Sequence, residues 1–124
     1  MADTGKAVLV VEDDREMREL VEVILEQAGY RVITAAEGQE ALAKVQEELP
    51  GVILLDMKMP GMNGWQFAHA FRAQHDHAVP IVVLTAATDA SSRAREIEAE
   101  GYLGKPFDLD DLLHTVERHL DNGT

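Results

Sequence analysis

The chain contains no cysteine, so disulfides, thiolate metal ligands and a cysteine nucleophile are all excluded. Positive charge is scarce, because 11 lysine and arginine residues stand against 23 aspartate and glutamate residues, a net charge of −12. An acidic surface repels nucleic-acid phosphates and anionic lipids, so we expect no direct nucleic-acid binding by this chain and no membrane partner. The first apolar run, residues 7–11, is too short for a signal peptide or a membrane span. The cytoplasm is therefore the expected location.

Apolar residues are nevertheless frequent enough for a hydrophobic core. The 124 residues are 46% hydrophobic, a share typical of a folded protein rather than a disordered acidic tail. A chain of this length buries roughly two-thirds of its surface on folding, which is sufficient without disulfides or a structural metal. We therefore expect a single domain over residues 1–124.

Short valine-rich runs alternate with segments of helical periodicity along the whole chain. The predicted strands span residues 7–11, 31–35, 52–55, 81–84 and 102–103. Helices are predicted between Asp14 and Gly29, over residues 39–49, 65–74 and 89–99, and after Asp108. Fully apolar strands that alternate with helices are typical of a parallel sheet covered by helices on both faces. The predicted fold class is therefore α/β.

Chemically active side chains stand at the ends of four predicted strands. They are Glu12, Asp13 and Asp14 after the first strand, Asp56 after the third, Thr85 after the fourth and Lys105 after the fifth. In open parallel sheets, ligands bind beyond the carboxyl ends of the strands. We therefore expect these side chains to meet at one edge of the sheet.

This set of residues indicates phosphoryl-transfer chemistry. Clustered carboxylates repel one another unless a cation is present, and oxygen ligands suit Mg²⁺. A carboxylate can also attack phosphorus and form an aspartyl phosphate. An amine and a hydroxyl, here Lys105 and Thr85, can stabilise the oxygens of the transferred group. The residues by themselves thus predict a Mg²⁺-dependent aspartyl-phosphate site with Asp56 as the nucleophile.

Four segments in this order resemble the receiver domains of two-component response regulators. They are residues 10–14 (Val-Val-Glu-Asp-Asp), 54–64 (Leu-Leu-Asp-Met-Lys-Met-Pro-Gly-Met-Asn-Gly), 84–86 (Leu-Thr-Ala) and 101–107 (Gly-Tyr-Leu-Gly-Lys-Pro-Phe). The resemblance extends from about Lys6 to Leu120. It implies a flavodoxin-like, doubly wound sheet of five parallel strands in the order 2-1-3-4-5. It also implies that Asp56 accepts a phosphoryl group from a phosphohistidine.

The same resemblance implies a role for individual residues. Glu12, Asp13, Asp56 and the backbone carbonyl of Lys58 would bind Mg²⁺, and Thr85 and Lys105 would hold the phosphoryl oxygens. Tyr102 would be an aromatic switch that turns inward as Thr85 moves toward the phosphate, and the Lys105–Pro106 peptide bond would be cis. Before phosphorylation, Lys105 is expected to pair with Asp56. Lys58 and Ala87 would flank the path of the water that removes the phosphoryl group.

The implied partners follow from the same family. They are a sensor histidine kinase or a phosphotransfer protein, a downstream protein target or an output domain outside this chain, and a second copy in a phosphorylation-dependent dimer. The chain would be a signalling switch that catalyses only its own phosphorylation and dephosphorylation.

Three other functions fit the sequence less well. A Mg²⁺-dependent aspartyl-phosphate phosphatase of small substrates would need a second acid two residues after the nucleophile, where Lys58 stands. A flavin-binding protein would need a phosphate loop where Glu12, Asp13 and Asp14 would repel phosphate. A phosphorylation-independent receiver would not need the complete set of residues.

Two further features lie outside these motifs. The stretch from Thr85 to Lys105 is shorter than the family pattern, which bears on the length and angle of the fourth helix. His75 and His77 are expected to be solvated rather than to bind a metal, and His119 is expected at a helix surface or end.

Overall fold

The structure, a computed structural model, describes residues 6–59, 61–86 and 88–122. The described residues form five strands and five helices in strict alternation. They are β1 (Val8–Val11), α1 (Arg15–Gln27), β2 (Val32–Ala35), α2 (Gly38–Glu47), β3 (Val52–Asp56), α3 (Gly64–His75), β4 (Ile81–Ala86), α4 (Ala90–Glu96), β5 (Gly101–Lys105) and α5 (Leu109–Asn122). None of the helices in these residues is long and apolar enough to cross a bilayer.

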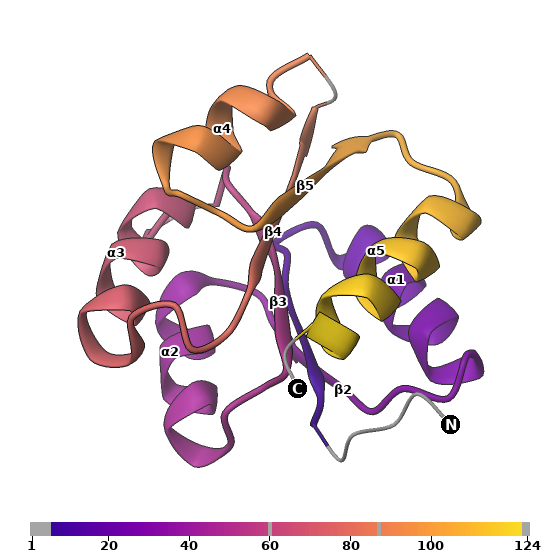
Figure 1. Cartoon of the computed structure of the whole chain (residues 1–124), viewed down its shortest axis with the longest axis horizontal. Helices are drawn as coiled ribbons and strands as arrows, with labels where there is room; N and C mark the ends of the chain where they lie inside the picture. Colours follow the sequence, from indigo (N-terminus) through magenta and orange to yellow (C-terminus); the bar gives the residue numbers. More distant parts are fainter. Residues whose placement is uncertain (1–5, 60, 87, 123–124) are drawn as a thin grey trace.

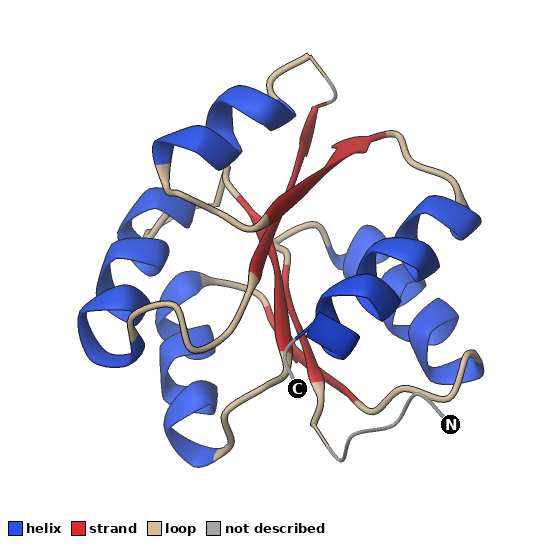
Figure 2. Cartoon of the chain, viewed as in Figure 1, coloured by secondary structure: helices blue, strands red, loops and turns tan. Residues whose placement is uncertain are grey.

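The strands pair in parallel in the order β2-β1-β3-β4-β5, which confirms the predicted α/β fold and strand order. Helices α2, α3 and α4 cover one face of the sheet, and α1 and α5 cover the other (Figure 1). The same view coloured by secondary structure shows the strands as a central layer between the two groups of helices (Figure 2).

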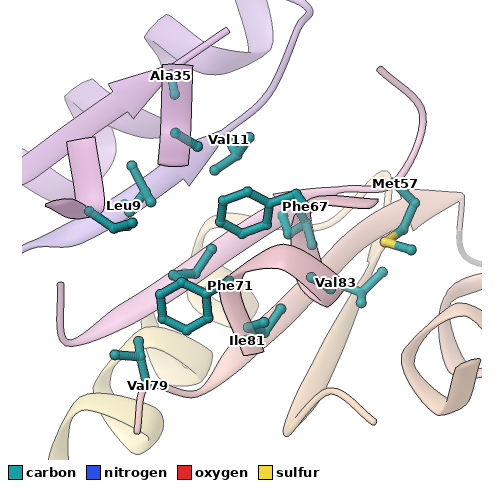
Figure 3. Close-up of a cluster of buried hydrophobic side chains, with 14 of the residues drawn as sticks. Leu9, Val11, Ala35, Met57, Phe67, Phe71, Val79, Ile81 and Val83 are labelled. Atoms are coloured by element: carbon teal, nitrogen blue, oxygen red, sulfur yellow. The ribbon is translucent and has the colours of Figure 1, made fainter. Parts of the chain in front are cut away.

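Strand residues alternate between two hydrophobic cores, one on each face of the sheet. Leu9, Ile81 and Val83 point to the side of α2 and α3, where they join Phe67 and Phe71 of α3 (Figure 3). The intervening residues point to the other side and pack against a second set of helix residues. That set is Val21 and Leu25 of α1 and Leu112, Val116 and Leu120 of α5. Burial on both faces explains why the central strands are continuous apolar runs.

The register of the sheet brings the expected site residues to one edge. Val11 of β1 is paired with Leu55 of β3, so that Glu12 and Asp56 follow on neighbouring strands. Thr85 of β4 is paired with Gly104, the residue before Lys105. Side chains that are far apart in the sequence are therefore neighbours at the carboxyl ends of the strands.

Polar side chains begin several of the helices. Asp14 accepts a hydrogen bond from the Met17 amide at 3.2 Å, and Asp108 accepts one from the Asp111 amide at 2.8 Å. Both residues stand where the sequence predicts that a helix begins. At the start of α3, Asn63 and Gln66 form a reciprocal capping box.

The fourth helix is shorter than predicted. It ends at Glu96 rather than at Ala99, and Glu98 adopts a left-handed backbone with φ of 53°. The Ala99 amide then donates to the Ala94 carbonyl at 2.9 Å, which closes the end of the helix. The chain reverses early because the Glu100 amide already bonds to Ile81 at the start of β4. As a result, β5 begins at Gly101, one residue before the predicted strand.

Candidate functional site

Three carboxylates form a compact cluster at the carboxyl edge of the sheet. Glu12, Asp13 and Asp56 each place an oxygen so that all three oxygens lie within 4.8 Å of one another. Glu12 and Asp56 are only 1% and 5% exposed, whereas Asp13 faces solvent. The structure thus brings together the three acidic side chains that the sequence predicts as metal ligands.

The cluster changes the protonation of Asp56. Burial, together with the neighbouring Asp13 and Glu12 carboxylates, raises the pKa of Asp56 to about 8, and the hydrogen bond from the Lys58 amide opposes this only in part. Asp56 in this arrangement therefore favours a proton. A cation bound between the three carboxylates would offset the repulsion between their negative charges. The residues therefore fit a divalent ion that prefers oxygen ligands, such as Mg²⁺.

Backbone groups next to the cluster hold two of its side chains in place. The Lys58 amide donates to Asp56 Oδ1 at 3.1 Å, and the Asp14 amide donates to Glu12 Oε2 at 3.1 Å. The Lys58 side chain itself is exposed.

The guanidinium of Arg18 in α1 also braces the loop, because it donates to the Glu12 carbonyl at 2.9 Å. Arg18 was not among the site residues predicted from the sequence. The sequence feature that could have indicated Arg18 is its position in the first turns of a helix that follows an acidic loop.

Lys105 lies at the site, but its partner differs from the prediction. Its ammonium contacts Glu12 Oε1 at 2.6 Å rather than Asp56. The ammonium thereby neutralises the more deeply buried of the two carboxylates, since Glu12 is 1% exposed and Asp56 is 5% exposed and already accepts from the Lys58 amide. The Lys105–Pro106 peptide bond is cis, as the resemblance implies.

The two residues of the expected switch lie on neighbouring strands. Thr85 is 3% exposed in β4, and Tyr102 is 54% exposed in β5, so its ring points away from the core. An outward ring is the starting position that the predicted switch requires. Ala87, the other expected neighbour of the phosphoryl group, lies outside the described residues.

The segment after Asp56 is packed tightly against the start of α3. A Cβ atom at Gly64 would lie 2.7 Å from Met57 Cα and 3.1 Å from the Asp56 carbonyl oxygen, so only glycine fits there. Met57 and Met59 are buried in the core beside it.

The histidines differ in part from their predicted surroundings. His119 lies in the last turn of α5, at a helix end as one of the two predicted positions, but it is only 8% exposed, and its Nδ1 lies 2.8 Å from the Thr115 carbonyl oxygen. It is buried because α5 presses it against Gly101, where an added Cβ would lie 2.9 Å from the imidazole. His77 is exposed and interacts with Glu100, not with a second histidine.

Comparisons with known proteins agree with this geometry. A family model described as response regulator receiver domain matches residues 8–117. The probable transcriptional regulator ycf27 of Cyanophora paradoxa is 36% identical over 124 residues, 96% of this chain and 51% of that protein. The DNA-binding response regulator MtrA of Mycolicibacterium paratuberculosis is 37% identical over 115 residues, 91% of this chain and 50% of that protein. The chain thus spans about half the length of these curated relatives.

Solved structures show the same similarity. The chemotaxis response regulator CheY4 of Vibrio cholerae has a TM-score of 0.83 and 40% identity, over 92% of this chain and 98% of that chain. NtrX from Brucella abortus has a TM-score of 0.88 and 28% identity, over 99% of this chain and 28% of that chain.

Proposed function

Because this chain belongs to the family of response regulator receiver domains, we propose that Asp56 accepts a phosphoryl group from a sensor histidine kinase or a phosphotransfer protein. The observation that carries the proposal is the cluster of Glu12, Asp13 and buried Asp56 at the sheet edge. The domain would catalyse only its own phosphorylation and dephosphorylation and would turn over no external metabolite.

In the proposed transfer, a carboxylate oxygen of Asp56 forms a bond to phosphorus. The bond between phosphorus and the donor imidazole nitrogen breaks, and its electron pair leaves with the imidazole, which takes up a proton. An acyl phosphate remains on Asp56. Attack of water on the same phosphorus later restores the carboxylate and releases inorganic phosphate.

Glu12, Asp13, Asp56 and the Lys58 carbonyl would hold Mg²⁺ during this reaction. When bound, the ion supplies positive charge that offsets the negative charge of the carboxylates and the phosphoryl oxygens. Lys105 and Thr85 would bind the phosphoryl oxygens. Since Lys105 now contacts Glu12 at 2.6 Å, its ammonium would move from that carboxylate to the phosphoryl group.

The proposed output is a change of conformation at Thr85 and Tyr102. The Thr85 hydroxyl would shift toward the phosphoryl group, and the exposed Tyr102 ring would turn inward. This change would be recognised by a downstream protein, by an output domain outside this chain or by a second copy in a dimer. The curated relatives of about twice this length support the second of these.

The test is phosphorylation by acetyl phosphate with Mg²⁺, followed by intact-mass measurement. We expect one added phosphoryl group that hydroxylamine removes, because hydroxylamine cleaves acyl phosphates but not phosphate esters. Asp56→Asn should lose most of the label. Asp14→Asn is the matched control, since it alters an acid at the same edge and asparagine preserves the helix cap. Labelling of Asp56→Asn to the wild-type level would contradict the assignment.

A further inference from the structure

Helix α4 has few apolar contacts that could determine its position. Its buried residues are Ala90 and Ala94, whose side chains are single methyl groups, and Ile97, the residue that follows the helix, is only partly buried against the core. Its N-cap residue, Asp89, makes no side-chain hydrogen bond to the first turn. Because apolar stabilisation scales with buried area, the position of α4 depends to an unusual degree on polar contacts.

Three side chains join the end of α4 to the start of α3, and we call them the Trp65 cluster. The indole Nε1 of Trp65 donates to Glu96 Oε1 at 2.7 Å, and Arg93 Nη1 donates to Glu96 Oε2 at 2.9 Å. The Arg93 guanidinium also lies over the Trp65 ring, 5.4 Å from its centroid. Each member of the cluster therefore contacts the other two.

A second contact holds the turn that follows α4. Arg72 of α3 donates through Nη2 to the Glu98 carbonyl at 3.2 Å and to Glu100 Oε1 at 3.2 Å. Between these contacts, a groove of about 340 Å³ separates α3 from the end of α4, and Trp65, Arg72 and Glu96 help to line it. The two helices lie on the same face of the sheet (Figure 1), but side-chain polar groups bridge them at this end.

The Trp65 cluster is connected to the site at both ends. Trp65 follows Gly64, whose amide donates to the Met57 carbonyl at 3.2 Å, next to Asp56. On the other side, α4 follows the strand that carries Thr85, and the Asp89 amide donates to the Ala86 carbonyl at 2.8 Å. The cluster therefore links the segment after Asp56 to the segment after Thr85.

We infer that the Trp65 cluster holds α4 in its unphosphorylated position and opens when Asp56 is phosphorylated. The inference rests on the proposed function of Asp56. A movement of α4 away from α3 at this end would separate Glu96 from the indole, which is now 2.7 Å from it. Contacts made in only one of two states favour that state, so Glu96 sets how readily the domain switches.

The first test needs no phosphorylation. Trp65 is the single tryptophan of the chain, so its emission reports directly on the cluster. In Glu96→Ala we expect emission at longer wavelength, stronger quenching by acrylamide and faster hydrogen exchange of the α4 amides. Glu96→Gln, which keeps an oxygen acceptor for the indole, should be intermediate. Glu117→Ala removes an exposed acid from α5 and is the charge-matched control. Unchanged α4 exchange in Glu96→Ala would overturn the inference, whatever the chemistry at Asp56.

The second test measures coupling to the site with beryllium fluoride, a stable mimic of the phosphoryl group, in the presence of Mg²⁺. Binding is followed by fluorine NMR, which does not depend on Trp65. We expect Glu96→Ala to reach half-saturation at a concentration at least about threefold lower than wild type, as expected for loss of a hydrogen bond to a charged group. If both proteins reach half-saturation at the same beryllium fluoride concentration, the inference about the Trp65 cluster is overturned, but the proposed function of Asp56 is not. Absence of a bound signal in the wild type would instead overturn the proposed function and with it the switch that the cluster controls.

Discussion

Asp13 is the solvent-facing acid beside Asp56, and its carboxylate contributes to the raised pKa of Asp56. Above the Asp56 pKa of about 8, where Asp56 is ionised, Asp13→Ala removes a like charge beside it and leaves no buried polar group without a partner. We therefore expect the metal-free variant to be more stable than wild type by about 1–3 kcal/mol. It should also lose the stabilisation that millimolar Mg²⁺ gives the wild type, because a ligand bound only by the folded state stabilises that state. Urea unfolding with and without Mg²⁺ measures both effects.

Asp14→Ala is the control for that experiment. Asp14 caps α1 through the Met17 amide and is not part of the carboxylate cluster. Its removal should destabilise the protein by about 1 kcal/mol and leave the response to Mg²⁺ intact. If Asp13→Ala instead behaves in the same way as Asp14→Ala, Asp13 is a structural residue and not a metal ligand.

Lys105 is the residue that we expect to couple phosphorylation to conformation. Lys105→Ala should still be phosphorylated at Asp56, because the nucleophile and the acidic cluster remain. Without the ammonium, however, the proposed exchange of Lys105 from Glu12 to the phosphoryl group cannot take place. Changes in amide chemical shift around Thr85 and Tyr102 on adding beryllium fluoride and Mg²⁺ should therefore be much smaller than in wild type.

The matched control is Lys58→Ala, which removes an exposed lysine close to Asp56 but retains the Lys58 backbone. It should give the full wild-type shift changes. A full response in Lys105→Ala would show that Lys105 is dispensable for the switch.

At the scale of elements, the turn between α4 and β5 is held by Glu100. Its carboxylate accepts from the Ile81 amide at 2.8 Å and from Arg72 at 3.2 Å, and it pairs with His77 at 3.0 Å. Burial acts to raise the pKa of Glu100, but the hydrogen bonds from His77, Ile81 and Arg72 outweigh burial and lower it. This single side chain thus joins α3, β4 and the start of β5.

The sign of the pH effect follows from the lowered pKa of Glu100. The ionised form is favoured in the folded state, so its stabilisation is present above the ordinary pKa of 4.5 and is lost as pH falls through the lower folded value. Glu100→Gln should destabilise the protein by about 1 kcal/mol at pH 7. The difference from wild type should shrink as pH falls below 4.5. Thermal or urea unfolding across this pH range is the measurement.

Glu98→Gln provides the comparison on the same turn. The Glu98 side chain is 81% exposed and lies 3.8 Å from His77, so its removal should have little effect at any pH. Equal effects of the two substitutions would show that the contacts of Glu100 contribute nothing to stability.

Periodicity predicted the elements well where a side chain could be assigned to the core, and poorly elsewhere. The central strands were recognisable because burial on both faces demands continuous apolar runs, as in β3. The end of α4 could not be recognised from the sequence, because the alanine-rich sequence there is compatible with a longer helix. What ends it is the hydrogen bond from Glu100 to Ile81, a contact with another strand.

At the scale of the whole molecule, the sequence alone determined the order of strands and helices and the edge at which the site lies. Parallel strands with intervening helices have one favoured handedness, so their carboxyl ends must meet on one side of the sheet. Glu12, Asp13 and Asp56 were for this reason predictable as neighbours from their positions after apolar runs. Local sequence patterns were sufficient to predict these features, because residues adjacent in the sequence determine where each strand and helix forms.

Only the tertiary structure decided which groups pair with one another. Lys105 bonds to Glu12, 93 residues away, rather than to Asp56, and so neutralises the more deeply buried of the two carboxylates. His119 became buried only when α5 packed against Gly101. The pairing of Trp65 with Glu96 likewise depends on how α3 and α4 lie on the sheet. Which groups pair depends on the distances between them, on their burial and on the other partners within reach, and all of these are defined only in the folded chain.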